Sequence, residues 1–237
     1  MSEILIFGGT TEGRREALRL QAEGRQVTVS VTSAYARSLL PESVDCRVGA
    51  LDRDGMLRFI REINPALVKD ATHPYAVRAS ENILACCKEL GVPCERIERP
   101  RQAHPWQEDV WHVPDTRSCA LALAATNGNV LLTTGSHTVK EYASAADPER
   151  LWVRVLPTHA ALVLCEEAGI PPSHIVAMQG PFSAELNAAL YDQLHIAVMV
   201  TKDSGVNGSV DEKVLPALAR QIQVIMIDRP KENENAR

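Results

Sequence analysis

The fold of this chain is decided near its amino terminus by Ile4-Leu5-Ile6-Phe7-Gly8-Gly9-Thr10-Thr11-Glu12-Gly13. The first four residues form an apolar run typical of a buried strand, and residues 14–23 have the pattern of a helix. Glycines between a strand and a helix let the backbone turn tightly and approach a ligand, and the first N–H groups of the helix point toward an anion. The stretch therefore predicts a site for a nucleotide phosphate.

Strand and helix patterns alternate along the rest of the chain. Strands are predicted at residues 4–7, 26–31, 67–70, 94–97, 110–113, 129–133, 151–155, 174–177, 197–201 and 223–227. Helices are predicted at residues 14–23, 35–40, 52–62, 76–90, 116–125, 139–145, 159–168, 183–194 and 211–218. This alternation favours an α/β fold with parallel strands, and so many strands favour two sheets of five or six over one open sheet.

Residues 99–109 interrupt the alternation. They contain Pro100, Pro105 and Trp106, with charged residues around them. Proline-containing polar segments of this kind are typical of loops and domain boundaries. We therefore expect a linker at 99–109 between an amino-terminal dinucleotide-binding domain, residues 1–98, and a carboxy-terminal domain, residues 110–237.

The unusual polar loops of the chain all follow predicted strands. They lie at residues 8–13, 70–75, 133–136, 179–183 and 202–205. By comparison, the loops that lead from helices back into strands contain residues that are typical of helix ends. In open α/β sheets ligands bind at the carboxyl ends of the strands, so the five polar loops together predict a binding site.

Composition narrows the classes of function. The chain has 45% hydrophobic residues, 4% aromatic residues and a formal net charge of −5. Few aromatic residues and no basic block argue against a nucleic-acid partner. No apolar run of about eighteen residues and no signal-peptide pattern occur, so we expect a cytoplasmic protein without a membrane partner. The six cysteines show no C-x-x-C pair and no zinc spacing, so we expect reduced thiols and no metal site.

The glycine loop departs from the dinucleotide-binding pattern G-x-G-x-x-G, because Thr10 stands at the middle glycine. A turn that serves only helix packing is the alternative interpretation. An acidic residue that holds the ribose of NAD is expected about twenty residues farther on. That region contains Ser30, Ser33 and Arg37 and no carboxylate, which favours the additional phosphate of NADP.

Three other loop residues have two interpretations each. His73 is a candidate general acid, because histidine titrates near neutrality, or it only hydrogen-bonds to backbone beside Pro74. Ser136 is part of an apparent anion-binding nest at residues 133–136, or it only caps the next helix. Lys202 neutralises a bound carboxylate or phosphate, or it is a solvated lysine.

Taken together, the loops resemble those of the precorrin-6A reductase family of cobalamin biosynthesis. The resemblance runs in order over nearly the whole chain. The stretches that carry it are Leu5-Ile6-Phe7-Gly8-Gly9-Thr10-Thr11-Glu12-Gly13, Asp70-Ala71-Thr72-His73-Pro74-Tyr75, Thr133-Thr134-Gly135-Ser136, Met178-Gln179-Gly180-Pro181-Phe182-Ser183 and Thr201-Lys202-Asp203-Ser204-Gly205.

The resemblance implies an NAD(P)H-dependent oxidoreductase that reduces one carbon–carbon double bond of a tetrapyrrole. It also implies two Rossmann-like halves, each a mostly parallel sheet flanked by helices, with the ligand cleft between them. Family members take either the metal-free or the cobalt-containing substrate, and the loops do not distinguish these. Oligomeric state is equally open, as a monomer or a small homo-oligomer.

Together with this resemblance, the loops give a set of expected site residues. We expect the cofactor, NADPH or less favourably NADH, at Gly8, Gly9, Thr10, Thr11, Glu12, Gly13, Ser30, Ser33 and Arg37. We expect substrate at Tyr75, Thr134, Gly135, Ser136, Gln179, Gly180, Lys202, Asp203 and Ser204. His73 and Lys202 are the expected catalytic residues, and cations such as Arg14, Arg15, Arg78 and Lys140 are expected to pair with substrate carboxylates.

Two other functions were compared with this one. A short-chain dehydrogenase or epimerase usually carries Tyr-x-x-x-Lys, and no tyrosine here has a lysine four residues on. A non-catalytic dinucleotide sensor is the second alternative, although a single domain would suffice for it.

Overall fold

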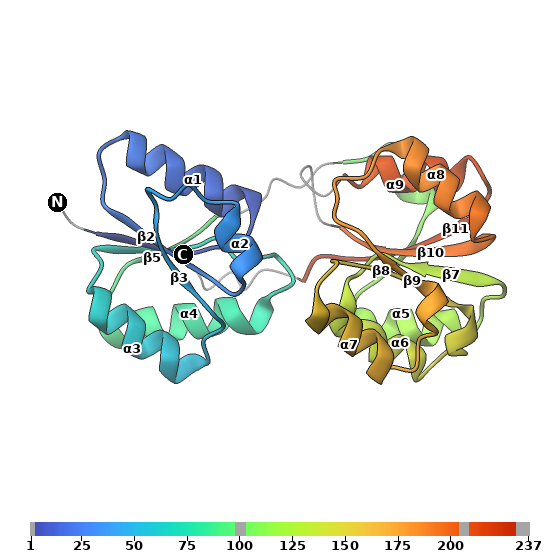
Figure 1. The fold of residues 1–237 in the computed structure, drawn as a ribbon, viewed down its shortest axis with the longest axis horizontal. Coiled ribbons are helices and arrows are strands. Elements are labelled where there is room, and N and C mark those ends of the chain that lie inside the picture. Colours follow the sequence, from blue (N-terminus) through green and yellow to red (C-terminus); the bar gives the residue numbers. More distant parts are fainter. Residues whose placement is uncertain (1–2, 98–102, 204–208, 231–237) are drawn as a thin grey trace. The chain divides into compact units, whose positions relative to one another are not determined.

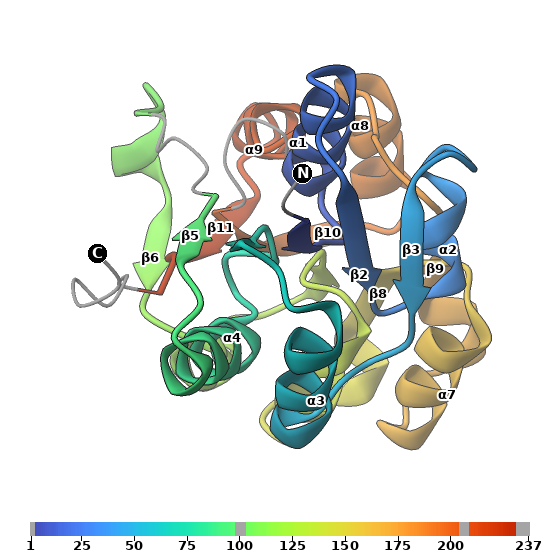
Figure 2. The same cartoon turned by 90° about the vertical axis from the view of Figure 1, so that its left-hand side faces the viewer.

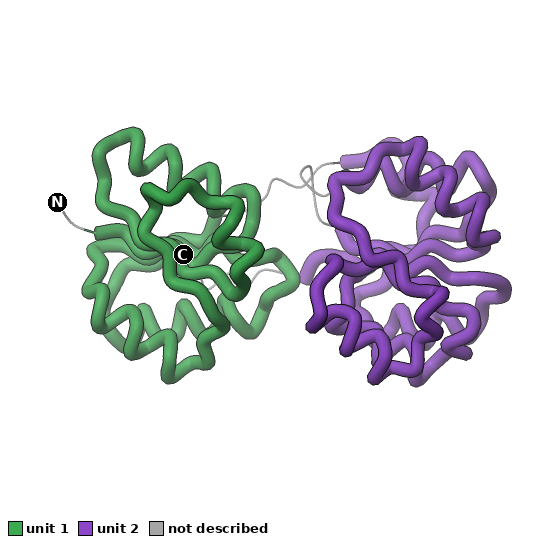
Figure 3. Tube along the Cα trace, viewed as in Figure 1, with its two compact units in different colours: residues 1–99, 231–237 green, residues 100–230 purple. Residues whose placement is uncertain are grey.

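The computed structural model describes residues 3–97, 103–203 and 209–230. The chain divides into two compact units, and the described residues up to 97 belong to one and those from 103 onward to the other (Figure 3). Each unit is a parallel sheet with helices on both of its faces (Figure 1). None of the helices in these described ranges has the length and apolar character that crossing a membrane would need.

The described part of the first unit forms a five-stranded sheet in the order β3-β2-β1-β4-β5. Its elements are β1 (Ile4–Phe7), α1 (Thr11–Ala22), β2 (Val27–Val31), α2 (Ala34–Ser38), β3 (Asp45–Val48), α3 (Arg53–Ile63), β4 (Leu67–Asp70), α4 (Val77–Leu90) and β5 (Cys94–Arg96). The chain builds outward from β1 to β3 and then returns to the other side of β1 with β4. The topological switch point therefore lies between β1 and β4.

Successive residues of β1 point to opposite faces of the sheet, and each face has its own core. Ile4 and Ile6 pack with Leu20 on the face covered by α1 and α2. Leu5 and Phe7 pack with residues of α3 and α4 on the other face. Figure 2 looks toward this unit, with α1 on one side of the sheet and α3 and α4 on the other.

The described part of the second unit forms a six-stranded sheet in the order β6-β11-β10-β7-β8-β9. Its strands are β6 (Trp111–Val113), β7 (Asn129–Leu132), β8 (Leu151–Val155), β9 (Ile175–Ala177), β10 (Ile196–Lys202) and β11 (Gln223–Ile227). Its α-helices are α5 (Thr116–Leu123), α6 (Val139–Ala143), α7 (His159–Glu167), α8 (Ala184–Gln193) and α9 (Asp211–Leu218). Here the switch point lies between β7 and β10. Helices α8 and α9 cover one face, and α5, α6 and α7 cover the other (Figure 1).

The predicted α/β class and the two parallel sheets are confirmed, with five and six strands. Most element ends differ from the predicted ones by one or two residues. Asp52 caps α3 by accepting a hydrogen bond from the Gly55 N–H at 2.7 Å, and Gly91 ends α4 in the left-handed conformation, with φ of +66°. Strand β3 was not predicted, because Asp-Cys-Arg-Val is a polar, partly exposed edge strand without an apolar alternation.

The segment expected to link the two domains is partly built into the second unit. Trp106 is 4% exposed and belongs to the core cluster that contains Tyr191 of α8 and Val214 of α9. Its indole Nε1–H donates to the Asp211 carboxylate at 2.7 Å. Residues 103–109 therefore pack with the second unit.

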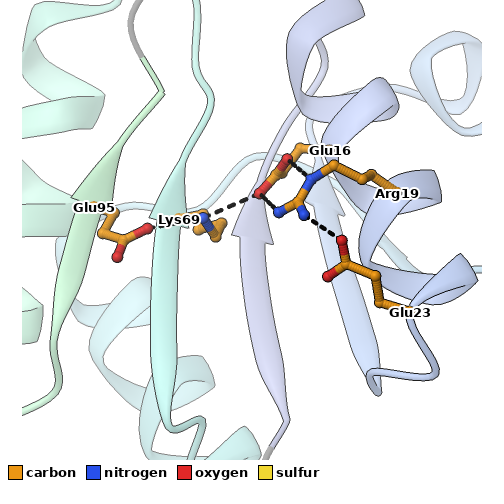
Figure 4. Close-up of polar contacts among 5 residues, drawn as sticks. All are labelled: Glu16, Arg19, Glu23, Lys69 and Glu95. Atoms are coloured by element: carbon orange, nitrogen blue, oxygen red, sulfur yellow. Dashed lines mark hydrogen bonds and ion pairs between the residues drawn. The ribbon is translucent and has the colours of Figure 1, made fainter.

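A chain of charged groups crosses one face of the first sheet (Figure 4). The Lys69 ammonium on β4 lies 3.0 Å from a carboxylate oxygen of Glu16 on α1 and 2.8 Å from one of Glu95 on β5. Glu16 also accepts two hydrogen bonds from Arg19 at 2.9 Å. The Arg19 bonds, and then Lys69, lower the pKa of Glu16 to about 2. This network joins α1 to the sheet.

Candidate active site

All five polar loops follow strands, so the topology places them on the carboxyl edges of the two sheets. In the first unit, residues 8–13 follow β1 and residues 70–75 follow β4, which are the two strands at its switch point. In the second unit, the loops at 133–136 and from 202 follow β7 and β10, again the strands at the switch point. The loop at 179–183 follows β9 at the edge of the same sheet.

The glycine loop of the first unit is shaped by close packing. A Cβ atom at Gly13 would lie 2.9 Å from the Ala71 Cβ and 3.3 Å from the Gly8 Cα, so only glycine fits there. Gly9 has φ of +109° and open space beside it. The Thr10 hydroxyl accepts from the Gly13 N–H at 3.1 Å, which caps α1, and donates to the Ala71 carbonyl at 2.8 Å. Thr10 therefore ties the loop after β1 to the loop after β4.

A pocket opens beside this loop. Its walls come from the glycine loop, the first turn of α1, the second half of β2, and α2 with the two residues that follow it. The residues lining it are Gly9, Thr10, Thr11, Arg14, Val29, Val31, Ala36, Leu39 and Leu40. An apolar wall, a helix N-terminus and one arginine can take an aromatic base on one side and a phosphate on the other. The cofactor residues predicted at 9–11 lie in this pocket, and Arg14 joins them there.

The other predicted cofactor residues have structural contacts near the pocket. Ser33 caps α2 by accepting from the Ala36 N–H at 3.1 Å, and Ser30 is buried in β2. The Arg37 guanidinium donates to the carbonyls of Leu40 and Pro41, both at 3.1 Å. Gly8 donates its N–H to the Ser30 carbonyl at 2.8 Å. These contacts fix the end of β2 and the helix that follows it.

The loop after β4 rests on a buried ion pair. Asp70 is 3% exposed and pairs with Arg96 of β5, and Arg96 also donates to the hydroxyls of Thr72 and Ser80 at 2.9 and 2.7 Å. His73 is exposed on this support, and its Nδ1 accepts from the Tyr75 N–H at 3.3 Å. The ring proton of neutral His73 is therefore on Nε2. Sequence reasoning missed Arg96, which no local pattern distinguishes.

In the second unit, Lys202 meets the loop that follows β7. Its ammonium donates to the Thr134 carbonyl at 3.2 Å, and burial lowers the pKa of Lys202. Gly135 has φ of +84°, and the Thr134 hydroxyl lies 3.2 Å from that of Thr138. Two predicted substrate loops are thus adjacent. Ser136 begins a 3₁₀ helix and makes no side-chain cap bond, so the prediction that it caps a helix is wrong.

Asp203 is held from the neighbouring strand. Its N–H donates to the Ile227 carbonyl at 3.0 Å, and the buried Arg229 guanidinium donates to the Asp203 carbonyl at 3.1 Å. Ser204, a further predicted substrate residue, lies outside the described residues. In the loop after β9, Gln179 is exposed and Ser183 caps α8 by accepting from the Leu186 N–H at 3.3 Å.

Besides Arg229, two further buried cations near the described parts of these loops were not predicted from the sequence. Arg154 of β8 is 7% exposed, and Lys213 of α9 is 9% exposed. Arg154 donates to the Asn187 amide oxygen at 2.6 Å and lies over the Phe182 ring at 4.1 Å, and Lys213 donates to the Thr201 hydroxyl at 3.1 Å. Within the described ranges neither cation forms an ion pair. For Arg154, the signal available in the sequence was a charged residue inside the apolar strand Leu-Trp-Val-Arg-Val.

The positive charge of these two side chains is partly uncompensated. Burial, and then the charge of Arg154, lowers the pKa of Lys213 to about 8, and burial lowers the pKa of Arg154. Buried cations with only neutral partners favour an incoming anion. Over the residues that the structure describes, no group of three or more His, Cys, Asp or Glu side chains could hold a metal ion.

Comparison with known proteins gives one consistent result. A family model described as "Precorrin-6x reductase CbiJ/CobK" matches residues 3–237. The cobalt-precorrin-6A reductase of Priestia megaterium is 37% identical over 96% of this chain and 91% of its own length. That of Methanothermobacter thermautotrophicus is 35% identical over 97% of this chain and 77% of its own length.

A relative named precorrin-6A reductase and a solved structure agree with this result. The precorrin-6A reductase of a Sinorhizobium species is 31% identical over 96% of this chain and 85% of its own length. A solved structure named "CobK precorrin-6A reductase" shares 28% identity, has a TM-score of 0.79, and is matched over 98% of this chain and 90% of that one. The match thus includes both units.

Proposed function

Since the chain belongs to the precorrin-6x reductase family, CbiJ/CobK, we propose that it reduces a carbon–carbon double bond of precorrin-6A or cobalt-precorrin-6A with a nicotinamide cofactor. It is then an oxidoreductase of cobalamin biosynthesis that acts on a CH–CH group. The observation that carries the proposal is the match over both units, together with polar loops at the switch point of each sheet.

The first unit fits a dinucleotide. Gly13 allows α1 to approach the loops closely, and Gly9, Thr10 and Arg14 line the pocket together with the apolar end of α2. We expect the loop N–H groups and Arg14 to hold the pyrophosphate. When bound, the reduced nicotinamide supplies the hydride. The absence of a carboxylate near Ser30, Ser33 and Arg37 supports NADPH over NADH.

The second unit fits an acidic macrocycle. Lys202 donates to the Thr134 carbonyl in the loop at residues 133–136. The buried cations Arg154 and Lys213 contact Phe182 in the loop after β9 and Thr201 of β10. The substrate residues Thr134, Gly135, Ser136, Gln179, Gly180 and Asp203 belong to these loops, and we assign Tyr75 to the substrate as well. Lys202 and the buried cations provide the charge that substrate carboxylates need.

Reduction of the double bond also requires a proton. We assign it to His73, because this residue is exposed at the switch point of the first unit and its neutral ring carries the proton on Nε2. The ion pair between Asp70 and Arg96 fixes the backbone from which His73 projects. The backbone at His73 is therefore fixed, and its side chain is exposed and can donate a proton.

One assay tests the function. Purified protein is mixed with NADPH or NADH and with precorrin-6A or its cobalt form, and the absorbance of cofactor and macrocycle is followed together. We expect equal amounts of cofactor to be oxidised and macrocycle to be reduced, faster with NADPH. Binding of NADPH without oxidation in any mixture would instead support the non-catalytic sensor.

A further inference from the structure

Asn187 occupies an unusual position in the second unit. It lies in the first half of α8, and its side chain is completely buried. Its amide group forms hydrogen bonds with three different segments of the chain. The amide Nδ2 donates to the Ser183 carbonyl at 2.8 Å and to the Glu212 carbonyl at 2.9 Å. Its Oδ1 accepts from Arg154 at 2.6 Å. One amide therefore joins the end of the loop after β9, the first turn of α9 and the end of β8.

The same contacts fix the loop from its other side. The Arg154 guanidinium carbon lies 4.1 Å from the centre of the Phe182 ring, a distance typical of a cation–π contact. Phe182 directly precedes Ser183, so the loop is held at two adjacent residues by one connected pair of side chains. A second link between the helices is the Tyr191 hydroxyl, which donates to the Lys213 carbonyl at 2.9 Å.

The choice of an amide matters for the charge. A buried arginine is usually paired with a carboxylate, which would neutralise it. Asn187 instead satisfies one Arg154 donor without adding negative charge, and Lys213 nearby has the neutral Thr201 as its hydrogen-bond partner. The positive charge of Arg154 and Lys213 is therefore not neutralised by their hydrogen-bond partners in the folded protein.

We propose that Asn187 is a positioning residue for the reaction: it sets the loop at residues 179–183 against the start of α9 and leaves the charge of Arg154 uncompensated for an acidic substrate. The inference rests on the proposed function, because it assigns the substrate carboxylates to this edge of the second sheet. Asn187 acts through the loop and through Arg154 and does not itself touch the substrate.

The test compares Asn187→Asp and Asn187→Ala with a matched control. Asn129 of β7 makes the same kind of bond, from its amide Nδ2 to the Leu194 carbonyl at 2.8 Å, but at the amino edge of the same sheet. Asn187→Asp keeps the size of the side chain, pairs with Arg154 and replaces the Nδ2 donor to the Ser183 and Glu212 carbonyls by a carboxylate oxygen. We therefore expect the KM for the tetrapyrrole to rise about tenfold while kcat and the Kd for NADPH stay close to wild type. Asn129→Ala should leave all three constants unchanged.

Two further measurements separate positioning from loss of stability. Asn187→Ala should speed hydrogen exchange of the Leu186 amide, which donates to the Ser183 hydroxyl, by about tenfold, because the anchor of Ser183 is lost, and Asn129→Ala should not. In an Arg154→Met background, Asn187→Asp should raise KM by less than it does in the wild-type background, since the part of its effect that acts through Arg154 is absent. A wild-type KM for Asn187→Asp, or an equal increase in exchange in the control, would overturn the inference.

Failure of the proposed function is a separate outcome. It would appear as a wild-type protein that oxidises neither nicotinamide cofactor with either form of the substrate. The exchange comparison between Asn187→Ala and Asn129→Ala needs no substrate, so it decides the positioning role even then. Unchanged exchange of the Leu186 amide in Asn187→Ala would reject that role.

Discussion

Both sheets are parallel and have polar loops at their carboxyl edges, but the two edges differ in charge. At the first switch point Asp70 and Arg96 neutralise each other, and the loops are joined by Thr10 and by closely packed glycines. In the second unit, Arg154 and Lys213 are buried and form no ion pair with other described residues. From this difference we infer that a parallel sheet offers a place for a ligand at its carboxyl edge, while the pairing of charges there decides which ligand fits.

The largest expected effect is on His73, the residue of the first unit that we assign to proton donation. His73→Ala should lower kcat about 100-fold, within the range for loss of a general acid, with little change in the Kd for NADPH. Turnover is measured across the pH range. His195→Asn, at an exposed histidine on the amino edge of the second sheet, is the control and should not change kcat. Unchanged turnover of His73→Ala at every pH would remove His73 from the mechanism.

The second prediction tests whether close packing makes the first unit the cofactor site. Gly13→Val places atoms against Ala71 and the Gly8 backbone, and overpacking of about 1–3 kcal/mol should weaken NADPH binding about 10- to 100-fold. Binding is followed by nicotinamide fluorescence. Gly24→Ala is the control, because Gly24 has φ of +74° but open space around it, so it should lose stability and no affinity. Equal affinity in Gly13→Val and wild type would move the cofactor elsewhere.

The third prediction tests the uncompensated charge of the second unit. The pKa of Lys213 is lowered from 10.5 to about 8, so the folded state disfavours its charged form, and stability should rise as the pH increases from about 8 to 10.5. Lys213→Met should stabilise the protein by about 1–3 kcal/mol at pH 7 and raise the KM for the tetrapyrrole about tenfold. Denaturant unfolding and steady-state kinetics measure the two effects.

Lys88→Met, at an exposed lysine of α4, is the control for this charge and should change neither value. If Lys213→Met were less stable than wild type and had an unchanged KM, the carboxyl edge of the second sheet would not be a site for an anion.

The fourth prediction concerns the choice between NADPH and NADH. Arg37→Ala should reduce the preference for NADPH about fivefold, as expected for a partly exposed charge pair worth about 1 kcal/mol. The ratio of kcat/KM for the two cofactors is the measurement. Arg25→Ala, at an exposed arginine after α1, is the control. A loss that is equal for both cofactors would show that Arg37 only supports the end of α2 through its bonds to Leu40 and Pro41.

The smallest expected effect is on the stability of the first unit as the pH is lowered. The pKa of Glu16 is lowered from 4.5 to about 2, so its contribution to stability is present above pH 4.5 and is lost as the pH falls toward 2. Allowing for solvent screening, Glu16→Gln should cost about 1 kcal/mol at pH 7 and almost nothing at pH 2. Urea unfolding at several pH values measures it. If the difference in stability between Glu16→Gln and wild type did not change with pH, the ion pairs with Lys69 and Arg19 would be excluded as its cause. The control is Glu42→Gln, at an exposed carboxylate, which should leave stability unchanged at every pH.

The sequence alone determined the features that depend on neighbouring residues. The run Ile4–Phe7 with its glycine turn, the Asp52 cap and the stop at Gly91 are local, because a few adjacent residues set backbone conformation and hydrogen bonding there. The alternation of strands and helices also placed the polar loops at strand ends. These loops carried the resemblance to the family, and their assignment to cofactor and substrate remains a prediction.

Tertiary structure decided the rest. The strand order brought β10 beside β7 and Lys202 to Thr134, and it paired the polar strand β3 with β2. It also brought Arg154 of β8, Asn187 of α8 and Lys213 of α9 together, although nothing near any of them in the chain signals the others. The energy of a buried charge depends on which groups surround it in space, and only the packing of distant segments fixes those groups.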